Sequence, residues 1–264
     1  MKTIVYTDLD GSLLDHHTYS PQKALPALEK LKNEGVPVVF CSSKTLYEQS
    51  KLQRELGVRH PCIVENGSAV AIPHGYFPSG AFEYHRTAAG FDLAVLAHAD
   101  VQQLRWVLQE IPGIDGYARS SDTEIAALTG LHGDDLDHAR NRMFTETILT
   151  PLSPERAADV ASHLQPHGFT LSRGGRFYTA LSAQTDKGRA VRWLTALYQK
   201  HNETELRTIA IGDSPNDAAM LEAVDRRFLV QRFDGSWAAL DIPGLERISG
   251  IGPAGWCAAV DRLF

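Results

Sequence analysis

The sequence predicts an α/β protein with a Rossmann-like parallel sheet as its core and an inserted α/β section in the middle of the chain. Short β-branched apolar runs alternate with stretches of helical spacing, which is typical of parallel strands joined by helices. This alternation stops near residue 83 and resumes near residue 185. We therefore expect residues 1–82 and 185–264 to form the core, and residues 83–184 to form an inserted α+β domain.

The first section of the chain supplies three predicted strands. Residues 3–7 form a β-branched run, which predicts the first strand. Ser20-Pro21 offers an N-cap and a first-turn proline for a helix, and Gly35 ends it. The remaining predicted elements of this section are a buried strand at 36–41, a helix opening at Ser43 and running to Leu56, and a third strand at 62–64.

The inserted section mixes helices and short strands. We expect helices at 93–111 and 124–129, and strands at 144–149, 169–172 and 176–181. Arg173-Gly174-Gly175 lies between the last two runs and predicts a hairpin.

The α/β pattern then returns. A helix that opens at Asp186 carries one apolar stripe: Ala190, Trp193, Leu194, Leu197 and Tyr198. Residues 208–211 predict another buried strand.

Composition excludes several classes of protein. The 264 residues are 43% hydrophobic and 22% charged, with a net charge of −6, and no basic stripe is present. This argues against a nucleic-acid partner. The longest apolar run falls short of a membrane span, so no membrane association is expected. Three widely spaced cysteines suggest a reducing compartment, and we expect a cytoplasmic location.

Two aspartates directly follow the first predicted strand. Leu9 separates Asp8 from Asp10, so both carboxylates can point beyond the strand end, where open α/β sheets bind ligands. Two adjacent carboxylates repel unless a cation lies between them or one keeps its proton. The pattern thus indicates Mg²⁺, acid–base chemistry or both, whereas an isolated DxDG can also be a solvated turn.

Three further signals lie at predicted strand ends or helix starts. They are Ser42, Lys187, and the pair Asp213 and Asp217. Together with the Asp8 and Asp10 pair, and in this order, they resemble the four motifs of the haloacid dehalogenase superfamily of phosphohydrolases. The resemblance implies that Asp8 attacks phosphorus to form an aspartyl-phosphate. Asp10 then protonates the leaving alkoxide and later activates water.

The other motif residues have implied roles in charge neutralisation. A phosphate dianion repels an anionic nucleophile, so Lys187 and Mg²⁺ neutralise it while Ser42 donates a hydrogen bond. Oxygen ligands suit Mg²⁺, and the implied set is Asp8, the Asp10 carbonyl, Asp213 and Asp217. Asp217 has an alternative role, which is to orient Lys187 or a metal-bound water. Ser42 alone could also be an ordinary helix N-cap.

A narrower resemblance covers nearly the whole chain. The segments Ser43-Lys44-Thr45, Glu65-Asn66-Gly67, Arg173-Gly174-Gly175-Arg176-Phe177-Tyr178, Asp186-Lys187-Gly188 and Gly252-Pro253-Ala254-Gly255-Trp256 are similar to those of mannosyl-3-phosphoglycerate phosphatases. That family implies a cap domain that confers substrate specificity, and hydrolysis of 2-O-mannosyl-3-phosphoglycerate to the compatible solute mannosylglycerate. The implied substrate-binding residues are Ser43, Lys44, Glu65, Asn66, Arg142, Gly174, Gly175 and Arg176.

Other functions remain open at this point. One is a broader sugar-phosphate phosphatase, such as one that favours glucosyl-3-phosphoglycerate. A phosphomannomutase-like phosphotransferase shares the DxD core, and a silent sugar-phosphate sensor would bind without turnover. We expect a monomer or homodimer. Residues 250–255 fit GxGxxG, but no βαβ unit follows them, so a dinucleotide site is not expected.

Overall fold

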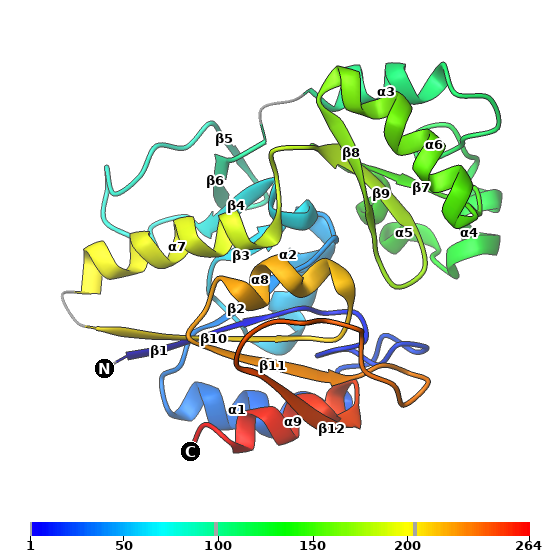
Figure 1. The fold of residues 1–264 in the computed structure, drawn as a ribbon. Helices are drawn as coiled ribbons and strands as arrows, with labels where there is room; N and C mark the ends of the chain where they lie inside the picture. Colours follow the sequence, from blue (N-terminus) through cyan, green and yellow to red (C-terminus); the bar gives the residue numbers. More distant parts are fainter. Residues whose placement is uncertain (1, 98–99, 203–204) are drawn as a thin grey trace.

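A nine-stranded sheet forms the centre of the larger unit of this protein (Figure 1). The structure is a computed structural model that describes residues 2–97, 100–202 and 205–264. The strand order is β12-β11-β10-β1-β2-β3-β4-β6-β5. The six strands from β12 to β3 run parallel, and β4, β6 and β5 are antiparallel. The strands are β1 (Lys2–Thr7), β2 (Val38–Cys41), β3 (Cys62–Val64), β4 (Ala69–Pro73), β5 (Arg86–Ala88), β6 (Phe91–Val95), β10 (Leu206–Gly212), β11 (Arg226–Gln231) and β12 (Leu245–Ile251).

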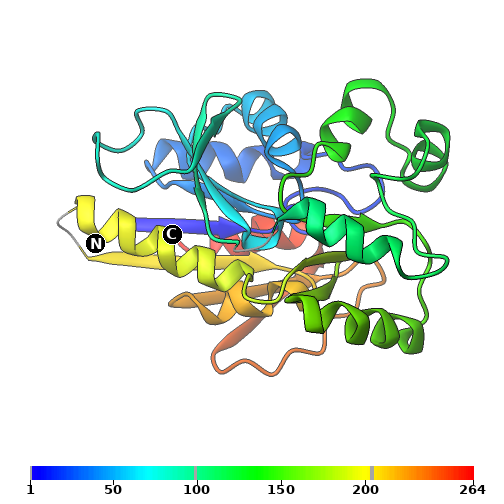
Figure 2. The same cartoon turned by 90° about the horizontal axis from the view of Figure 1, so that it is seen from above.

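Helices cover both faces of this sheet, because successive side chains of a strand point to opposite sides. In β1, Val5 packs with residues of α1 (Leu25–Asn33) and α9 (Pro253–Asp261). Ile4 and Tyr6 pack on the other face with α7 (Lys187–Asn202) and α8 (Ala218–Glu222). Figure 2 shows α7 extending along the sheet. The larger unit also contains α2 (Leu46–Leu56), η1 (Gln22–Ala24), η2 (Glu65–Gly67) and η4 (Pro215–Asp217).

A smaller unit lies at one end of the large sheet (Figures 1 and 2). Its sheet has the order β7-β9-β8, and all its pairs are antiparallel. Its elements are α3 (Val101–Gln109), α4 (Asp122–Thr129), α5 (Gly133–Arg140), β7 (Glu146–Ile148), α6 (Pro154–Leu164), η3 (Gln165–His167), β8 (Phe169–Arg173) and β9 (Tyr178–Ser182). β8 and β9 form the hairpin that the Gly-Gly pair predicted. Two apolar clusters of its own stabilise this unit.

The α/β fold class is confirmed, but the prediction for residues 93–111 is wrong in its first part. Residues 91–95 form β6, which pairs with β4 and β5 in the large sheet. The helix begins only at Val101, where the Asp100 carboxylate caps it. Pairing with a distant strand outweighs the local helical spacing here. Residues 86–95 therefore belong to the large sheet, although the insert was expected to start at residue 83.

Two helices begin later than the sequence predicted. The helix expected to open at Ser43 begins at Leu46, where Thr45 and Glu48 form a capping box. The first helix is preceded by η1, so Pro26 falls in the first turn of α1, where proline is tolerated. Among the described residues, no helix combines the length and apolarity needed to cross a bilayer.

Candidate active site

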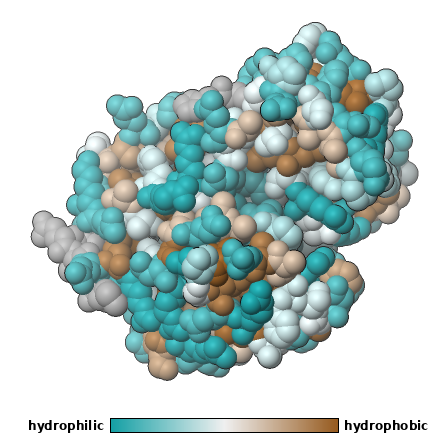
Figure 3. Space-filling model, in the orientation of Figure 1, coloured by the Kyte–Doolittle hydropathy of each residue, from teal (hydrophilic) through white to brown (hydrophobic). Residues whose placement is uncertain are grey.

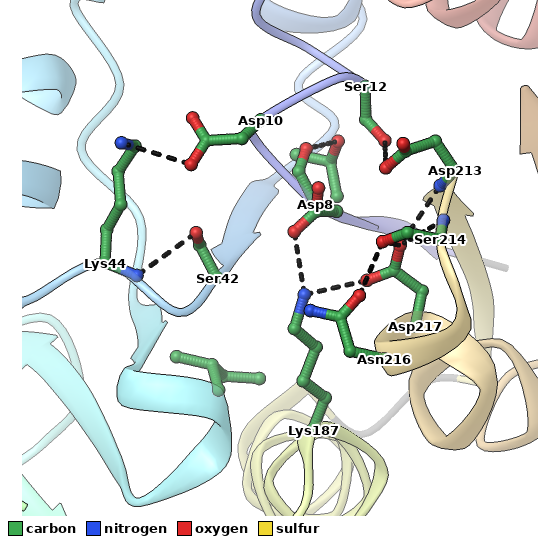
Figure 4. A network of polar contacts seen from close by, with 12 residues as sticks. Asp8, Asp10, Ser12, Ser42, Lys44, Lys187, Asp213, Ser214, Asn216 and Asp217 are labelled. Carbon is green, nitrogen blue, oxygen red and sulfur yellow. Dashed lines mark hydrogen bonds and ion pairs between the residues drawn. The ribbon is translucent and has the colours of Figure 1, made fainter. Parts of the chain in front are cut away.

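Four chain segments meet at the carboxyl edge of the parallel strands (Figure 4). Asp8 follows β1, and its amide donates to the Ile211 carbonyl of β10 at 2.9 Å. Ser42 follows β2, and Asp213 follows β10. Lys187 is the first residue of α7. The structure thus brings together residues that are up to 205 positions apart in the sequence, as the strand-end pattern predicted.

Lys187 lies at the centre of this group. Its Nζ donates to Asp8 Oδ1 and to Asp217 Oδ1, both at 2.7 Å (Figure 4). The side chain is buried, with 2% of the residue exposed. Burial lowers the pKa of Lys187, but the carboxylates of Asp217 and Asp8 outweigh this effect and raise it overall. Lys187 is therefore a permanent cation beside the Asp8 carboxyl.

Asp217 uses both carboxylate oxygens in contacts with the protein. Oδ1 accepts from Lys187, and Oδ2 accepts from the amides of Asp213 and Ser214 at 3.0 and 3.1 Å. A Cβ at Gly212 would lie 2.7 Å from Asp217, so the absence of a side chain there permits this approach. Of the two roles predicted for Asp217, these contacts favour orienting Lys187 over ligating a metal.

Three buried carboxyl groups lie close together here, and Lys187 bonds to two of them, Asp8 and Asp217. One oxygen each from Asp8, Asp213 and Asp217 lies within 4.8 Å of the others. Burial, followed by repulsion from Asp217, raises the pKa of Asp8 to about 7, although Lys187 opposes the shift. Burial and the Asp8 charge also raise the pKa of Asp213. Full ionisation leaves an excess of two negative charges, so these oxygen donors fit a divalent cation.

The loop after β1 brings Asp10 and Ser12 to opposite sides of Asp8. Ser12 Oγ donates to Asp213 Oδ1 at 3.3 Å. Gly11 has a φ of +86°, and a Cβ there would lie 2.8 Å from Asp213 Oδ2. The Asp10 side chain is directed instead toward Lys44, whose Nζ lies 3.2 Å from Asp10 Oδ2. The Asp10 carboxylate therefore stands outside the group of three.

Ser42 and Lys44 form the adjoining wall of the site. Ser42 is 1% exposed, and its Oγ accepts from the Lys44 amide at 3.3 Å. Burial lowers the pKa of Lys44, but Asp10 and Glu48 outweigh it, and the pKa rises overall. Because the N-cap of α2 is Thr45, the alternative in which Ser42 is a helix cap is wrong.

A cavity of about 410 Å³ opens from Asp10 into the space between the two units. In Figure 3, a hollow separates the smaller unit at upper right from the larger one. Six of the eight predicted substrate-binding residues line the cavity: Ser43, Lys44, Arg142, Gly174, Gly175 and Arg176. The larger unit supplies the first two and the inserted section supplies the others. The cavity therefore has cationic groups on both sides, and the carboxylates of Asp10, Glu48, Glu55 and Asp135 also line it.

The two arginines make different contacts. Arg142 is buried, and its guanidinium donates to the Ser43 carbonyl at 2.7 Å and to Thr145 Oγ1 at 3.0 Å. Arg176 is exposed and donates to the Leu128 carbonyl at 2.6 Å. Arg142 thus joins the two units, while Arg176 lies in the hairpin loop of the smaller unit at the cavity.

Glu65 has a different role from the one predicted. We expected it to bind substrate hydroxyls, but it is completely buried and does not line the cavity. Its Oε1 accepts from the Met143 amide at 2.8 Å. Its Oε2 accepts from the amides of Phe144 and Thr145 and from Thr145 Oγ1 at 2.8–3.0 Å. Glu65 therefore fixes the segment that carries Arg142.

Asn66 also lies outside the cavity lining. Its amide donates to the Ser42 carbonyl at 3.0 Å, and it has a φ of +59°. Its Oδ1 is buried with no hydrogen-bond partner in the described part of the chain. The contacts of Asn66 support the Ser42 loop.

Sequence reasoning missed several residues of the site. Glu48, His16 and Tyr19 line the cavity, and Ser12 bonds to Asp213. The DxDGS pattern gave a signal for Ser12, and the Thr45–Glu48 capping box gave one for Glu48. Residues 15–20 form a loop with no periodic signal, so their position depended on the tertiary structure.

Comparisons with known proteins agree along most of the chain. A family model described as haloacid dehalogenase-like hydrolase matches residues 5–89 and 121–234. A glucosyl-3-phosphoglycerate/mannosyl-3-phosphoglycerate phosphatase of Methanococcoides burtonii is 36% identical, over 100% of this chain and 98% of that protein. A phosphatase with the same name from Persephonella marina is 32% identical, over 99% and 97%. A mannosyl-3-phosphoglycerate phosphatase of Pyrococcus furiosus is 36% identical, over 87% and 91%.

Solved structures share the fold at lower identity. The sucrose-phosphatase of Synechocystis, in complex with sucrose and phosphate, superposes with a TM-score of 0.65 at 14% identity, over 99% of this chain and 98% of that one. A haloacid dehalogenase-like hydrolase from B. subtilis gives a TM-score of 0.63 at 16% identity, over all of both chains.

Proposed function

This chain belongs to the mannosyl-3-phosphoglycerate phosphatase family of haloacid dehalogenase-like hydrolases and is a phosphoric monoester hydrolase, and we propose that it hydrolyses 2-O-mannosyl-3-phosphoglycerate to mannosylglycerate and phosphate. One observation carries the proposal: Asp10, two residues after the Asp8 that pairs with Lys187, lines a cavity to which both units contribute cationic side chains. The substrate carries a phosphate and a carboxylate, which match such a lining. A cytoplasmic location remains our prediction.

We propose that Asp8 is the nucleophile and forms an aspartyl-phosphate. Lys187 holds one oxygen of Asp8 at 2.7 Å, which fixes the carboxylate and favours its ionised form. The same ammonium can neutralise charge on the phosphoryl oxygens. Ser42, which is buried beside the cavity wall, supplies a hydroxyl donor for the phosphate.

We assign acid–base work to Asp10. Its carboxylate lines the cavity, apart from the Asp8 group and on the side where the leaving oxygen would lie. Lys44 holds one of its oxygens, so the carboxyl group keeps a fixed direction. Asp10 would protonate the leaving alkoxide, and its carboxylate would then accept a proton from the water that attacks the aspartyl-phosphate.

We propose that Asp8, Asp213 and the Asp10 carbonyl hold Mg²⁺. The excess negative charge of the buried carboxyl groups and their oxygen chemistry support this assignment. Bound there, Mg²⁺ would supply charge stabilisation for the phosphoryl oxygens. Asp217 serves this arrangement by directing Lys187 toward Asp8.

We further propose that the insert acts as a cap that confers specificity. Arg142, Gly174, Gly175 and Arg176 bring its surface to the cavity, where the glycosyl and glycerate groups would lie. Two relatives are named for both glucosyl and mannosyl substrates. Glucosyl-3-phosphoglycerate is therefore the second candidate substrate.

A phosphate-release panel tests this function. The substrates are mannosyl-3-phosphoglycerate, glucosyl-3-phosphoglycerate, 3-phosphoglycerate and p-nitrophenyl phosphate, each with Mg²⁺ or with EDTA. We expect the highest kcat/KM for the mannosyl compound, and loss of turnover in EDTA. Asp8→Asn should abolish turnover of all four while the protein stays folded.

Three results would contradict the proposal. A requirement for a sugar bisphosphate, with transfer in place of release, would indicate a phosphotransferase. Binding of the mannosyl compound without any phosphate release would indicate a sensor. Equal kcat/KM for glycosylated and unglycosylated phosphoglycerate would refute a cap that recognises the sugar.

A further inference from the structure

A short loop of the larger unit faces the hairpin of the smaller unit across the cavity. The loop, residues 15–20, lies between β1 and η1 and is closed by its own hydrogen bonds. The Asp15 carboxylate accepts from the amides of His17 and Thr18 at 3.0 Å. The Tyr19 amide donates to the Asp15 carbonyl at 2.9 Å. These bonds give the loop a defined shape from which Tyr19 projects.

Tyr19 has a backbone conformation that is unusual for its residue type. Its φ is +54°, in the left-handed region that favours glycine. Aromatic residues adopt this region only where the surroundings fix them. The conformation places the Tyr19 side chain in the lining of the cavity.

The Tyr19 side chain contacts one cation from each unit. The Lys44 ammonium lies 5.1 Å from the centre of its ring. Its hydroxyl oxygen accepts from Arg176 Nη1 at 3.4 Å. The same loop meets the hairpin at a second point, where the His16 ring lies beside Gly175. His16 is in turn stacked on Phe233, with ring centres 4.4 Å apart.

The two cations differ in their charge balance. Lys44 forms ion pairs with Asp10 at 3.2 Å and Glu48 at 3.6 Å. The described partners of Arg176 are two carbonyl oxygens, the Tyr19 hydroxyl and the Phe177 ring. Arg176 thus has no carboxylate partner in the part of the chain that the structure describes. A positive charge of this kind at the cavity suits an anionic group of the ligand.

We propose that Tyr19 is a specificity-determining residue that restrains Arg176 in the lining of the cavity it shares with Lys44, so that both cations receive the carboxylate of the phosphoglycerate group. The proposal rests on the proposed function for the identity of the substrate. The hydroxyl of Tyr19 restrains the Arg176 side chain, which loses rotational freedom before the ligand binds. Such preorganisation lowers the entropic cost of binding.

Competition experiments test this inference without relying on turnover of a glycosylated substrate. p-Nitrophenyl phosphate reports the rate, and 3-phosphoglycerate and glycerol 3-phosphate compete with it. These two competitors differ at one end, where only the first has a carboxylate. We expect the wild-type protein to bind 3-phosphoglycerate more tightly. In Tyr19→Phe, its inhibition constant should rise by about 3- to 10-fold, as for loss of one hydrogen bond, while that of glycerol 3-phosphate changes less than about 2-fold.

Two further variants show whether Tyr19 acts through Arg176. Arg176→Ala should abolish the preference for 3-phosphoglycerate, and adding Tyr19→Phe to it should cause no further loss. Tyr84→Phe is the matched control, because Tyr84 is 56% exposed and lies outside the cavity lining. It should leave both inhibition constants at wild-type values.

Specific outcomes would overturn the inference. A Tyr19→Phe variant that keeps the wild-type preference for 3-phosphoglycerate would show that the Tyr19 hydroxyl does not position Arg176. An equal rise for both competitors would indicate a general structural effect. If the preference survives in all variants while the wild type fails to hydrolyse glycosyl-3-phosphoglycerates, both this inference and the proposed function fail. If only that hydrolysis is missing, the proposed function alone fails.

Discussion

Glu65 provides a direct test of the contacts between the two units. Its carboxylate accepts four hydrogen bonds from Met143, Phe144 and Thr145, and the residue is completely buried. In Glu65→Gln, one oxygen becomes an NH₂ group that must face a donor. The least costly placement puts this group against the Met143 amide, because three donors face the other oxygen. We expect the free energy of unfolding to fall by about 1.5–3 kcal/mol, the range for losing a charge-assisted hydrogen bond.

Glu65→Ala should have a larger effect. It removes the acceptor of all four hydrogen bonds, so the backbone amides of Met143, Phe144 and Thr145 lose their acceptor. Because a buried donor without a partner costs about 1–3 kcal/mol and water can replace part of the loss, we expect about 3–5 kcal/mol in total. Urea unfolding, followed by tryptophan fluorescence and by circular dichroism, measures both variants. Thr145→Val removes one of the four donors to Glu65, together with the hydroxyl that accepts from Arg142 Nε, and completes a double-mutant cycle with Glu65→Gln.

The competing role for Glu65 predicts a different result. If Glu65 binds substrate hydroxyls, Glu65→Gln should raise KM for the glycosylated substrate and barely change the unfolding transition. A change below about 0.5 kcal/mol together with a KM increase above about tenfold would refute the assignment made here. In our interpretation, any loss of activity follows the loss of stability and arises because Arg142 is less well fixed.

Three further predictions address the buried charges and one close backbone approach. The pKa of Asp8 is about 7 in the folded metal-free protein and near 3.8 in the unfolded chain. Asp8 therefore contributes to the free energy of unfolding at low pH, and this contribution is lost as the pH rises through 7. The Tm in EDTA should therefore fall between pH 5 and 8, and less so with Mg²⁺ or in Asp8→Asn; a Tm that rises in EDTA would contradict the argument. Lys187→Met removes the only ammonium that bonds to Asp8 and Asp217 in the described residues. The free energy of unfolding in urea should fall by about 3–5 kcal/mol, and phosphate release should be abolished. A variant with wild-type stability would disprove this pairing. Gly67→Ala would place a Cβ 2.2 Å from the Asp186 carbonyl oxygen at a φ of +94°, so the Tm and the activity of this variant should fall. Gly80→Ala is the control, because a Cβ at Gly80 would meet no atom within 4 Å. Equal Tm values for the two variants would show that the contact at Gly67 relaxes freely.

The sequence indicated which residues would meet at the sheet edge, because that outcome depends on local signals. Buried strands end where apolar runs end, and parallel strands share one carboxyl edge. Asp8, Ser42 and Asp213 therefore meet although they lie far apart along the chain. Their catalytic and metal-binding roles stay predictions until activity is measured.

Other features depended on contacts that no local pattern reveals. Residues 91–95 have apolar spacing compatible with a helix, and pairing with β4 makes them a strand. Glu65 follows a strand at the expected edge, but its partners come from about 80 residues further along the chain. Tyr19 lies in a loop whose role depends on a hairpin more than 150 residues away. In each case the missing information was the position of a distant segment.

The contacts between the two units are distributed unevenly around the cavity. On one side, Glu65 and Arg142 make short bonds, and Thr45 Oγ1 donates to the His138 carbonyl at 2.8 Å. On the other side, the Tyr19–Arg176 bond is 3.4 Å long. A rigid-body rotation that preserves these short contacts must turn about an axis close to residues 138–145 of the smaller unit. Such a rotation would lengthen the Tyr19–Arg176 bond first and widen the cavity there for a ligand, while the Arg142–Ser43 contact would be kept.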